Sequence, residues 1–249
     1  MENKLKSINK TIDESTKNLV ALLMNDVTLH KANNSFLTED SVRLQLTDFL
    51  GATRIREKMK HGYDLMMNDL PAYLTKIQLD LVNQELENAV DIITSMMQEK
   101  GQTEEMGHKL EELPDHLQGI LQISDSTFNH FYDAGYRYYN AKRYHEAANV
   151  FFLLSFLNPY QFNVLLALGL AEANQHQWQK ALQAFASAGL LDLKSVYPHL
   201  YSAQCYQQMG DEANMENALE GVFYILEKHP HPEGEKIKSF IQKLSQKKR

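Results

Sequence analysis

The feature that most constrains the fold is a 34-residue period in the second half of the chain. Gly135 and Gly169 lie 34 residues apart, and Ala203 follows after another 34. In the first two units an alanine comes twelve residues after the glycine and a phenylalanine four residues later: Ala147 and Phe151, then Ala181 and Phe185. Two helices approach closely only where the crossing residues are small, so this pattern predicts a repeated pair of packed helices in which Ala147 and Ala181 press closest against the glycines.

The period predicts an all-α fold, a tetratricopeptide-repeat helical solenoid of three repeats. We place the repeats at 128–161, 162–195 and 196–229. The third repeat is degenerate because Met215 stands where the close-packed alanine is expected, and terminal repeats are often atypical. Ser124 or Ser126 is expected to cap the first helix of the array. After the prolines that follow His229, we expect a C-terminal capping helix over about 234–246.

Residues 1–115 have no such repeat, but their apolar residues follow a helical period. Three amphipathic stretches are expected, over 5–27, over 42–70, and from Pro71 to 97. Residues 98–115 contain two glycines, a proline and many charges, which is typical of a linker. We therefore predict two domains: a separate α-helical N-terminal region at 1–115, for dimerisation or an accessory role, and a tetratricopeptide-repeat domain at 116–249.

The composition favours a cytoplasmic location. The single cysteine, Cys205, excludes an internal disulfide framework, and the N-terminus has no apolar stretch of a secretory signal. The longest apolar run, 150–157, is too short to span a bilayer. The net charge of −7 would repel nucleic acid. The final residues, 236–249, carry six Lys and Arg and no acidic residue, which we interpret as a solvated helix end rather than as a membrane or nucleic-acid patch.

No catalytic or metal-binding pattern emerges from the sequence. The ten histidines are scattered, without the HExxH spacing of a zinc site, and His229 and His231 merely flank a proline. Cys205 has no evident base partner and is interpreted as a buried structural thiol. Trp178 is interpreted as a packing residue, and Tyr138 is expected to pack in the core of the first repeat. We therefore expect no enzyme activity, no cofactor and no metal.

From Ile120 onward the order of features resembles the LcrH/SycD family of type III secretion translocator chaperones, the class II tetratricopeptide-repeat chaperones. The residues that carry the resemblance are those of the first two repeats and the junction LLDLKSVYPHLYSAQCYQQMGD, residues 190–211, which contains Cys205. The resemblance covers about half of the chain. It implies a bacterial cytosolic chaperone that holds hydrophobic translocator proteins before export, and a possible homodimer through N-terminal helices. The family has only a short helical segment before its repeats, so the role of 1–115 is not implied.

The repeat register predicts which residues line a peptide-binding groove on the concave side of the first helices. These residues are Asn129, Tyr132, Tyr136, Tyr139, Asn140, Asn163, Leu166, Leu170, Asn174, Tyr197, Leu200 and Gln204. Tyrosines and leucines would provide apolar contacts, while hydroxyl and amide groups would meet the backbone of an extended peptide. No Lys or Arg occupies these positions, so capture of a free carboxylate terminus is not expected. The tyrosine face of the first repeat could equally pack against the N-terminal helices.

Two other functions remain open from the sequence. A tetratricopeptide-repeat scaffold or adaptor would bind folded partner proteins in a secretion or regulatory complex, whereas a chaperone keeps its partner partly unfolded. An enzyme with a helical regulatory domain would need a catalytic constellation within 1–115, and that region contains none that we recognise.

Overall fold

The structure is a computed structural model that describes residues 52–98, 116–229 and 232–246. The first predicted amphipathic stretch and almost all of the predicted linker lie outside these residues. Within them the fold is all-helical without strands, which confirms the predicted fold class. The elements are α3 (Ala52–Asp69), the 3₁₀ turn η2 (Leu70–Ala72), α4 (Lys76–Gln98), α6 (Leu117–Ile120), α7 (Asp125–Asn140), α8 (Tyr144–Leu157), α9 (Phe162–Ala173), α10 (Trp178–Leu191), α11 (Tyr197–Met209), α12 (Glu212–Lys228) and α13 (Gly234–Gln246).

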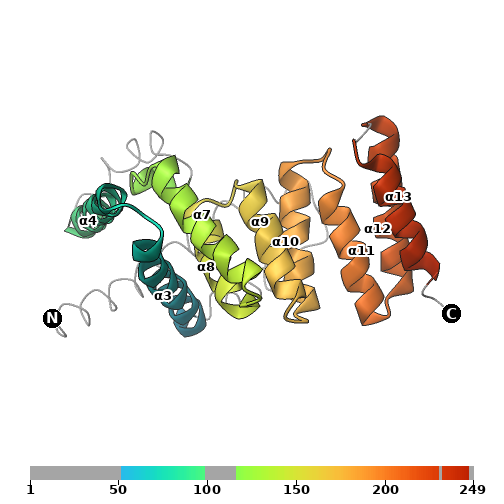
Figure 1. The fold of residues 1–249 in the computed structure, drawn as a ribbon, viewed down its shortest axis with the longest axis horizontal. Coiled ribbons are helices and arrows are strands. Elements are labelled where there is room, and N and C mark those ends of the chain that lie inside the picture. Colours follow the sequence, from blue (N-terminus) through green and yellow to red (C-terminus); the bar gives the residue numbers. More distant parts are fainter. Residues whose placement is uncertain (1–51, 99–115, 230–231, 247–249) are drawn as a thin grey trace.

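Helices α7 to α12 form three consecutive antiparallel pairs that lie side by side in a row (Figure 1). Each of the three predicted repeat ranges corresponds to one pair, although α7 begins at Asp125, before the first range. The Ser124 side chain caps α7 by accepting a hydrogen bond from the backbone N–H of Thr127 at 3.2 Å, so Ser124 is the cap of the two serines considered. At the other end α13 begins at Gly234, as predicted, and buries Ile237 and Ile241 against the last pair.

The turn between the two helices of each pair has the same backbone in all three repeats. Lys142, His176 and Gly210 occupy equivalent positions, and each has a positive φ, of 60°, 60° and 74° respectively. The next residue donates its N–H to a carbonyl five residues back, with distances of 2.9, 3.0 and 2.9 Å for Arg143, Gln177 and Asp211. This is the Schellman arrangement that ends a helix, in which glycine is the favoured residue. Only the third repeat has glycine there.

The glycines of the repeat signature lie closer to the phenylalanine rings of the second helices than to the alanines of those helices. A Cβ atom on Gly135 would lie 2.7 Å from Phe151 Cε1 and 3.0 Å from Val150 Cγ1. Gly169 is similarly close to the ring of Phe185. We expected Ala147 and Ala181 to press closest, and this detail was wrong, because the larger phenylalanine ring reaches across the helix pair. Both alanines are nevertheless fully buried.

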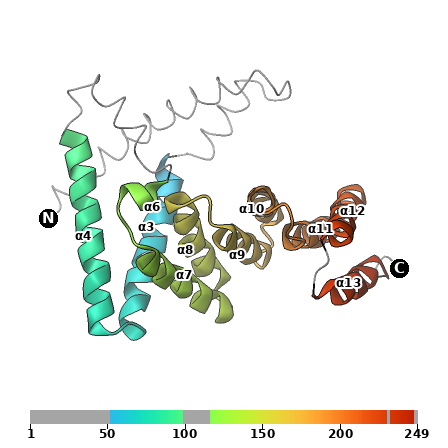
Figure 2. The same cartoon turned by 90° about the horizontal axis from the view of Figure 1, so that it is seen from above.

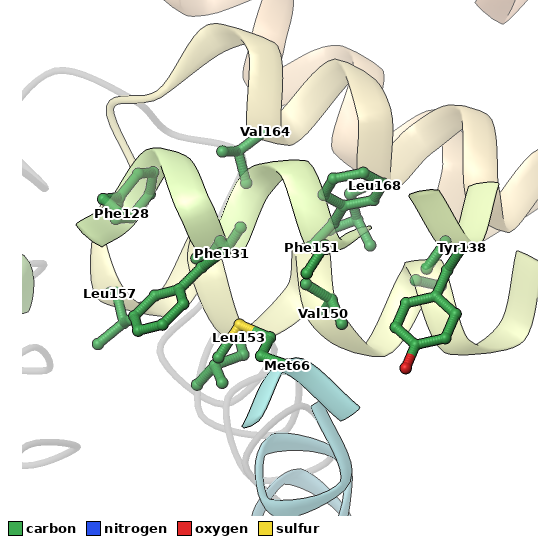
Figure 3. Close-up of a cluster of buried hydrophobic side chains, with 14 of the residues drawn as sticks. Met66, Phe128, Phe131, Tyr138, Val150, Phe151, Leu153, Leu157, Val164 and Leu168 are labelled. Carbon is green, nitrogen blue, oxygen red and sulfur yellow. The ribbon is translucent and has the colours of Figure 1, made fainter. Parts of the chain in front are cut away.

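The buried apolar side chains form three separate clusters. The large first cluster joins α3, α4, α7, α8 and α9 around Phe131, Phe151 and Leu154 (Figure 3). The third repeat and α13 share another cluster around Leu219 and Val222. Between them, only Ala181, Phe185 and Cys205 make up a small buried cluster, surrounded by half-buried side chains. The predicted core position of Tyr138 is confirmed, since its side chain lies in the first cluster.

Helix α3 packs across α8 and shares the core of the first repeat (Figure 2). Gly62 permits the close approach, because a Cβ atom there would overlap the backbone carbonyl of Asn149. Met66 lies beside Leu153 of α8 (Figure 3), and the Tyr138 hydroxyl donates a 3.2 Å hydrogen bond to the backbone carbonyl of Leu65. The domain boundary at 115/116 stays a prediction, but residues on both sides of it build one core.

Two ion pairs hold α3 to the repeat array. Lys58 Nζ lies 2.9 Å from the Glu172 carboxylate at the end of α9. Near the other end of α3, the Arg137 guanidinium lies 2.6 Å from the Asp69 carboxylate and stacks over the ring of Tyr73 at 3.8 Å. Both pairs are largely shielded from solvent, so breaking either one would leave a shielded charge without its partner. The two pairs therefore restrict where α3 can lie on the repeat array.

Helix α4 follows after a turn at Pro71, close to where the third amphipathic stretch was predicted to open. Its start is fixed by a capping box, a signal that the sequence analysis missed. The Thr75 N–H donates to Gln78 Oε1 at 3.0 Å, and the Gln78 N–H donates to Thr75 Oγ1 at 3.3 Å. Val82 of α4 is buried in the first core cluster, while Ile77 and Leu81 are exposed.

Candidate functional site

The predicted groove residues all lie on the first helices of the three pairs or at the ends of those helices. Their exposure divides them into three groups. Exposed residues are Asn129, Tyr136, Asn140, Asn163 and Asn174; half-buried residues are Tyr132, Tyr139, Leu166, Leu170, Tyr197 and Gln204; and Leu200 is buried. A surface of half-buried aromatic and aliphatic side chains with exposed amides beside them suits a polypeptide ligand better than a small polar one.

Contacts between side chains join the predicted residues of the first and second repeats. The Asn174 amide donates a 3.1 Å hydrogen bond to the Tyr139 hydroxyl, although the two residues are 35 positions apart in sequence. Tyr132 packs on Phe151, with ring centroids 5.5 Å apart. Tyr136 makes no such core contact and is 51% exposed, which leaves its ring available to a ligand.

The third repeat contributes an aromatic stack of the predicted Tyr197 with Tyr201, which the sequence analysis did not assign to the site. Tyr197 stacks on Tyr201 with centroids 6.1 Å apart, and Tyr201 in turn packs on Phe185 at 5.6 Å. The four-residue spacing of the two tyrosines on one helix was the available signal. The Tyr197 hydroxyl also donates to the Glu233 carboxylate at 3.4 Å, just before α13. Tyr201 thus connects the second and third repeats on the side of the first helices.

Burial disfavours ionisation of three tyrosines of this surface. It raises the pKa of Tyr132, Tyr139 and Tyr201 above the ordinary value, and neighbouring tyrosines add to the effect. Each hydroxyl can therefore donate as well as accept a hydrogen bond over the whole physiological pH range.

One predicted groove residue, Leu200, lies inside the protein. Its side chain is 6% exposed and belongs to the core cluster of the third repeat with Leu219 and Val222. The cluster that buries it also includes Ile237 and Ile241 of α13, a helix outside the three repeats. The other residues remain candidates, and their role in binding stays a prediction.

The groups capable of chemistry do not converge on this surface. Cys205 is buried, as predicted, and desolvation raises the pKa of its thiol to about 11, so it is a poor nucleophile at neutral pH. In the part of the chain that the structure describes, no group of three or more His, Cys, Asp and Glu residues could hold a metal ion. Within the same residues, no helix combines the length and apolarity needed to cross a membrane.

The comparison of sequences gives a clear relative. Over 100 residues, 40% of this chain, it is 26% identical to the low calcium response locus protein H of Yersinia pestis, and the Yersinia pseudotuberculosis protein matches equally well. The resemblance predicted from the sequence is confirmed. The match spans 60% of the length of these relatives. No protein-family model matches the chain.

Chains of two solved complexes have the same fold. A chain of a CopN–Scc3 complex is 25% identical, with a TM-score of 0.51, and the match covers 66% of this chain and 99% of the other. A chain of a T3SS complex from Aeromonas hydrophila is 20% identical, with the same TM-score of 0.51, over 57% of this chain and 96% of the other. The second likeness concerns the fold alone.

Proposed function

We propose that this protein is a cytosolic, non-enzymatic chaperone of a bacterial type III secretion system. It holds a short extended segment of a hydrophobic translocator protein and prevents its aggregation before export. The observation that carries the proposal is the 100-residue match to low calcium response locus protein H, a member of the family that the repeat junction resembles. The aromatic and amide-rich surface of the first helices supports it, because this is the surface a peptide would need.

The proposed binding segment lies across the first helices of the repeats, over Tyr132, Tyr136, Leu166 and Leu170. Burial of two or three cargo side chains at about 1.5–3 kcal/mol each, less the cost of ordering the segment, corresponds to micromolar binding. Cargo release should depend only weakly on salt, since the residues predicted to line the surface carry no formal charge. Amide groups such as that of Asn174 would pair with the cargo backbone.

Co-expression with a translocator of the same secretion system tests the proposal. The chain should keep the translocator soluble, and Tyr136→Ala combined with Leu170→Ala should abolish co-purification while the helical signal in circular dichroism persists. The matched control is Tyr160→Ala, because Tyr160 is 53% exposed but lies outside the predicted surface. Normal cargo binding by the double variant, or release of the cargo by moderate salt, would reject this surface as the binding site.

A scaffold that binds folded partners is the competing function. The two functions differ in the state of the bound partner, which hydrogen exchange measures directly. A chaperone leaves most of the translocator amides exchanging rapidly, whereas a scaffold leaves its partner fully protected.

Self-association is a further part of the proposal. We infer that any homodimer forms through the N-terminal helices within 1–115, of which the structure describes only 52–98. Sedimentation of the full chain and of 116–249 would decide it: a dimeric full chain and a monomeric fragment are expected, and two monomers would reject the idea.

A further inference from the structure

A pocket lies where α3 meets α8, the end of α9 and the start of α10, away from the predicted peptide-binding surface. Its volume is about 450 Å³, which is within the range of ligand pockets in proteins. None of the residues that line it was predicted to line the groove. One wall of the pocket is formed by Glu57, Lys58 and His61 of α3, the helix that Gly62 lets approach the backbone of α8.

Asn149 is the unusual residue of this pocket. Its side chain is 97% buried, and among the described residues no hydrogen bond reaches its amide group. The buried side chains of Gln118, Asn158 and Glu172, by contrast, are paired: Asn158 donates to Gln118 at 2.8 Å, and Glu172 lies 2.9 Å from Lys58. A buried amide without a partner costs the full penalty of desolvation. An unpartnered amide that lines a pocket therefore indicates a ligand that supplies the missing hydrogen bonds.

The charges around the pocket cancel. Lys58 is paired with Glu172, and the remaining charged residues, Glu57 and Lys180, have opposite signs. Such a pocket does not favour a carboxylate or phosphate over a neutral group. It favours a ligand that is itself uncharged and carries both a donor and an acceptor.

The hydrogen-bonding groups that remain are amides and imidazoles. His61 of α3 and His145 of α8 both line the pocket and lie next to each other, with ring centroids 6.3 Å apart. His145 uses Nδ1 for a 3.2 Å hydrogen bond with Gln175 Oε1, so its other ring nitrogen remains available. The Asn149 amide can donate through NH₂ and accept through its oxygen, which matches the C=O and N–H of a peptide group.

We propose that this pocket binds a short, uncharged, extended segment of a partner polypeptide through its main-chain peptide groups. Asn149 supplies the central pair of hydrogen bonds, and the two imidazoles line the sides. The site is independent of the proposed cargo surface, so a partner can occupy it whether or not a translocator is bound. Because the pocket recognises the backbone rather than the side chains of the partner, partner segments of different sequences can bind to it.

The test uses the full-length chain and a blocked tripeptide, N-acetyl-Ser-Val-Ser-N-methylamide, as the probe. Two-dimensional NMR should show saturable shifts of the Asn149 side-chain amide and of the indole of Trp178, the only tryptophan, which follows the pocket residue Gln177. Asn149→Leu should weaken probe binding by about tenfold, since two hydrogen bonds are lost. The melting temperature should not fall, because leucine has a similar volume and removes an unpaired polar group.

A second variant and a control complete the experiment. His61→Trp places a large ring in the pocket mouth and should abolish the shifts without affecting the core. Tyr136→Ala, on the predicted cargo surface, should leave probe binding unchanged. A lower melting temperature for Asn149→Leu would show that Asn149 is structural and overturn the proposal. Shifts produced equally by sodium acetate would indicate an anion site, and the absence of shifts with the probe would also overturn it.

Discussion

The repeat array and helix α3 share one core, but different contacts hold them together. Within the array, one contact recurs: a small residue on the first helix accommodates a phenylalanine of the second, as at Gly135 and Gly169. Helix α3 is joined instead by contacts that occur once, namely Gly62 against the α8 backbone and the two ion pairs of Lys58 and Asp69. Recurring contacts leave a period in the sequence, whereas single contacts leave none.

The largest expected effect comes from removing α3 and α4 altogether. We predict that the fragment 116–249 remains helical but is less stable than the full chain, by on the order of 5 kcal/mol. The cause is the loss of Met66, Leu70 and Val82, which are almost completely buried against the first repeat. Urea unfolding of both proteins measures the difference. Equal midpoints would show that the array is self-sufficient and that α3 only covers it.

Breaking the pair between α3 and α9 comes next. Lys58→Met leaves Glu172, whose side chain is 5% exposed, without its cation and should cost about 3 kcal/mol. The matched control is Lys238→Met, because the Lys238–Glu235 pair is exposed and should contribute close to nothing. Chemical denaturation of the two variants compares them directly. If Lys58→Met and Lys238→Met lower the free energy of unfolding equally, the burial of Glu172 does not make its ion pair more stabilising than an exposed one.

Glycine substitutions should have smaller effects on stability, and they compare the contact of α3 with α8 to a contact within the repeat array. Gly62→Ala should destabilise the protein by about 1–3 kcal/mol, because the added methyl group overlaps the α8 backbone. Gly189→Ala in α10 meets only an ordinary contact at 3.5 Å from Pro198, so better helix propensity should leave stability equal or raise it by up to about 1 kcal/mol. Thermal unfolding distinguishes them, and the same sign for both would contradict the described packing of α3.

The smallest effect concerns the inter-helix turns. Lys142→Gly and His176→Gly should each stabilise the protein by up to about 1 kcal/mol, because both residues adopt the left-handed conformation that Gly210 adopts without strain. Gly210→Ala is the reverse substitution and should destabilise by a similar amount. Melting temperatures of the three variants suffice. A loss of stability in Lys142→Gly would mean that its side chain, rather than its backbone, is what the turn requires.

These contrasts explain which parts of the fold could be predicted from the sequence. The helix pairs, the cap at Ser124 and the core position of Tyr138 follow from period and local chemistry, which act over a few residues. The position of α3 does not, because Lys58 and Glu172 are 114 residues apart and neither stands in a recognisable pattern. The burial of Leu200 was missed for a related reason: its cluster includes Ile237 and Ile241 of α13, which lies outside the repeat register.

The candidate site was predictable to the same extent. The register placed tyrosines and asparagines such as Tyr136 and Asn174 on the first helices, since position within a repeat decides which way a side chain points. It could not identify the pocket at Asn149, because one wall of that pocket belongs to α3. The sequence alone does not show that an asparagine in a second helix is buried in a pocket, because the helix that covers it is not part of the repeat.

The small central cluster has a mechanical consequence. Stiffness in a row of helices comes from packed side chains that resist sliding, and the middle cluster, where α10 meets α11, has only Ala181, Phe185 and Cys205 as members. We therefore expect bending of the array to concentrate between the two larger clusters. The curvature of the array can therefore change there, as at an elastic joint, while the first repeat and the C-terminal cap keep their internal packing.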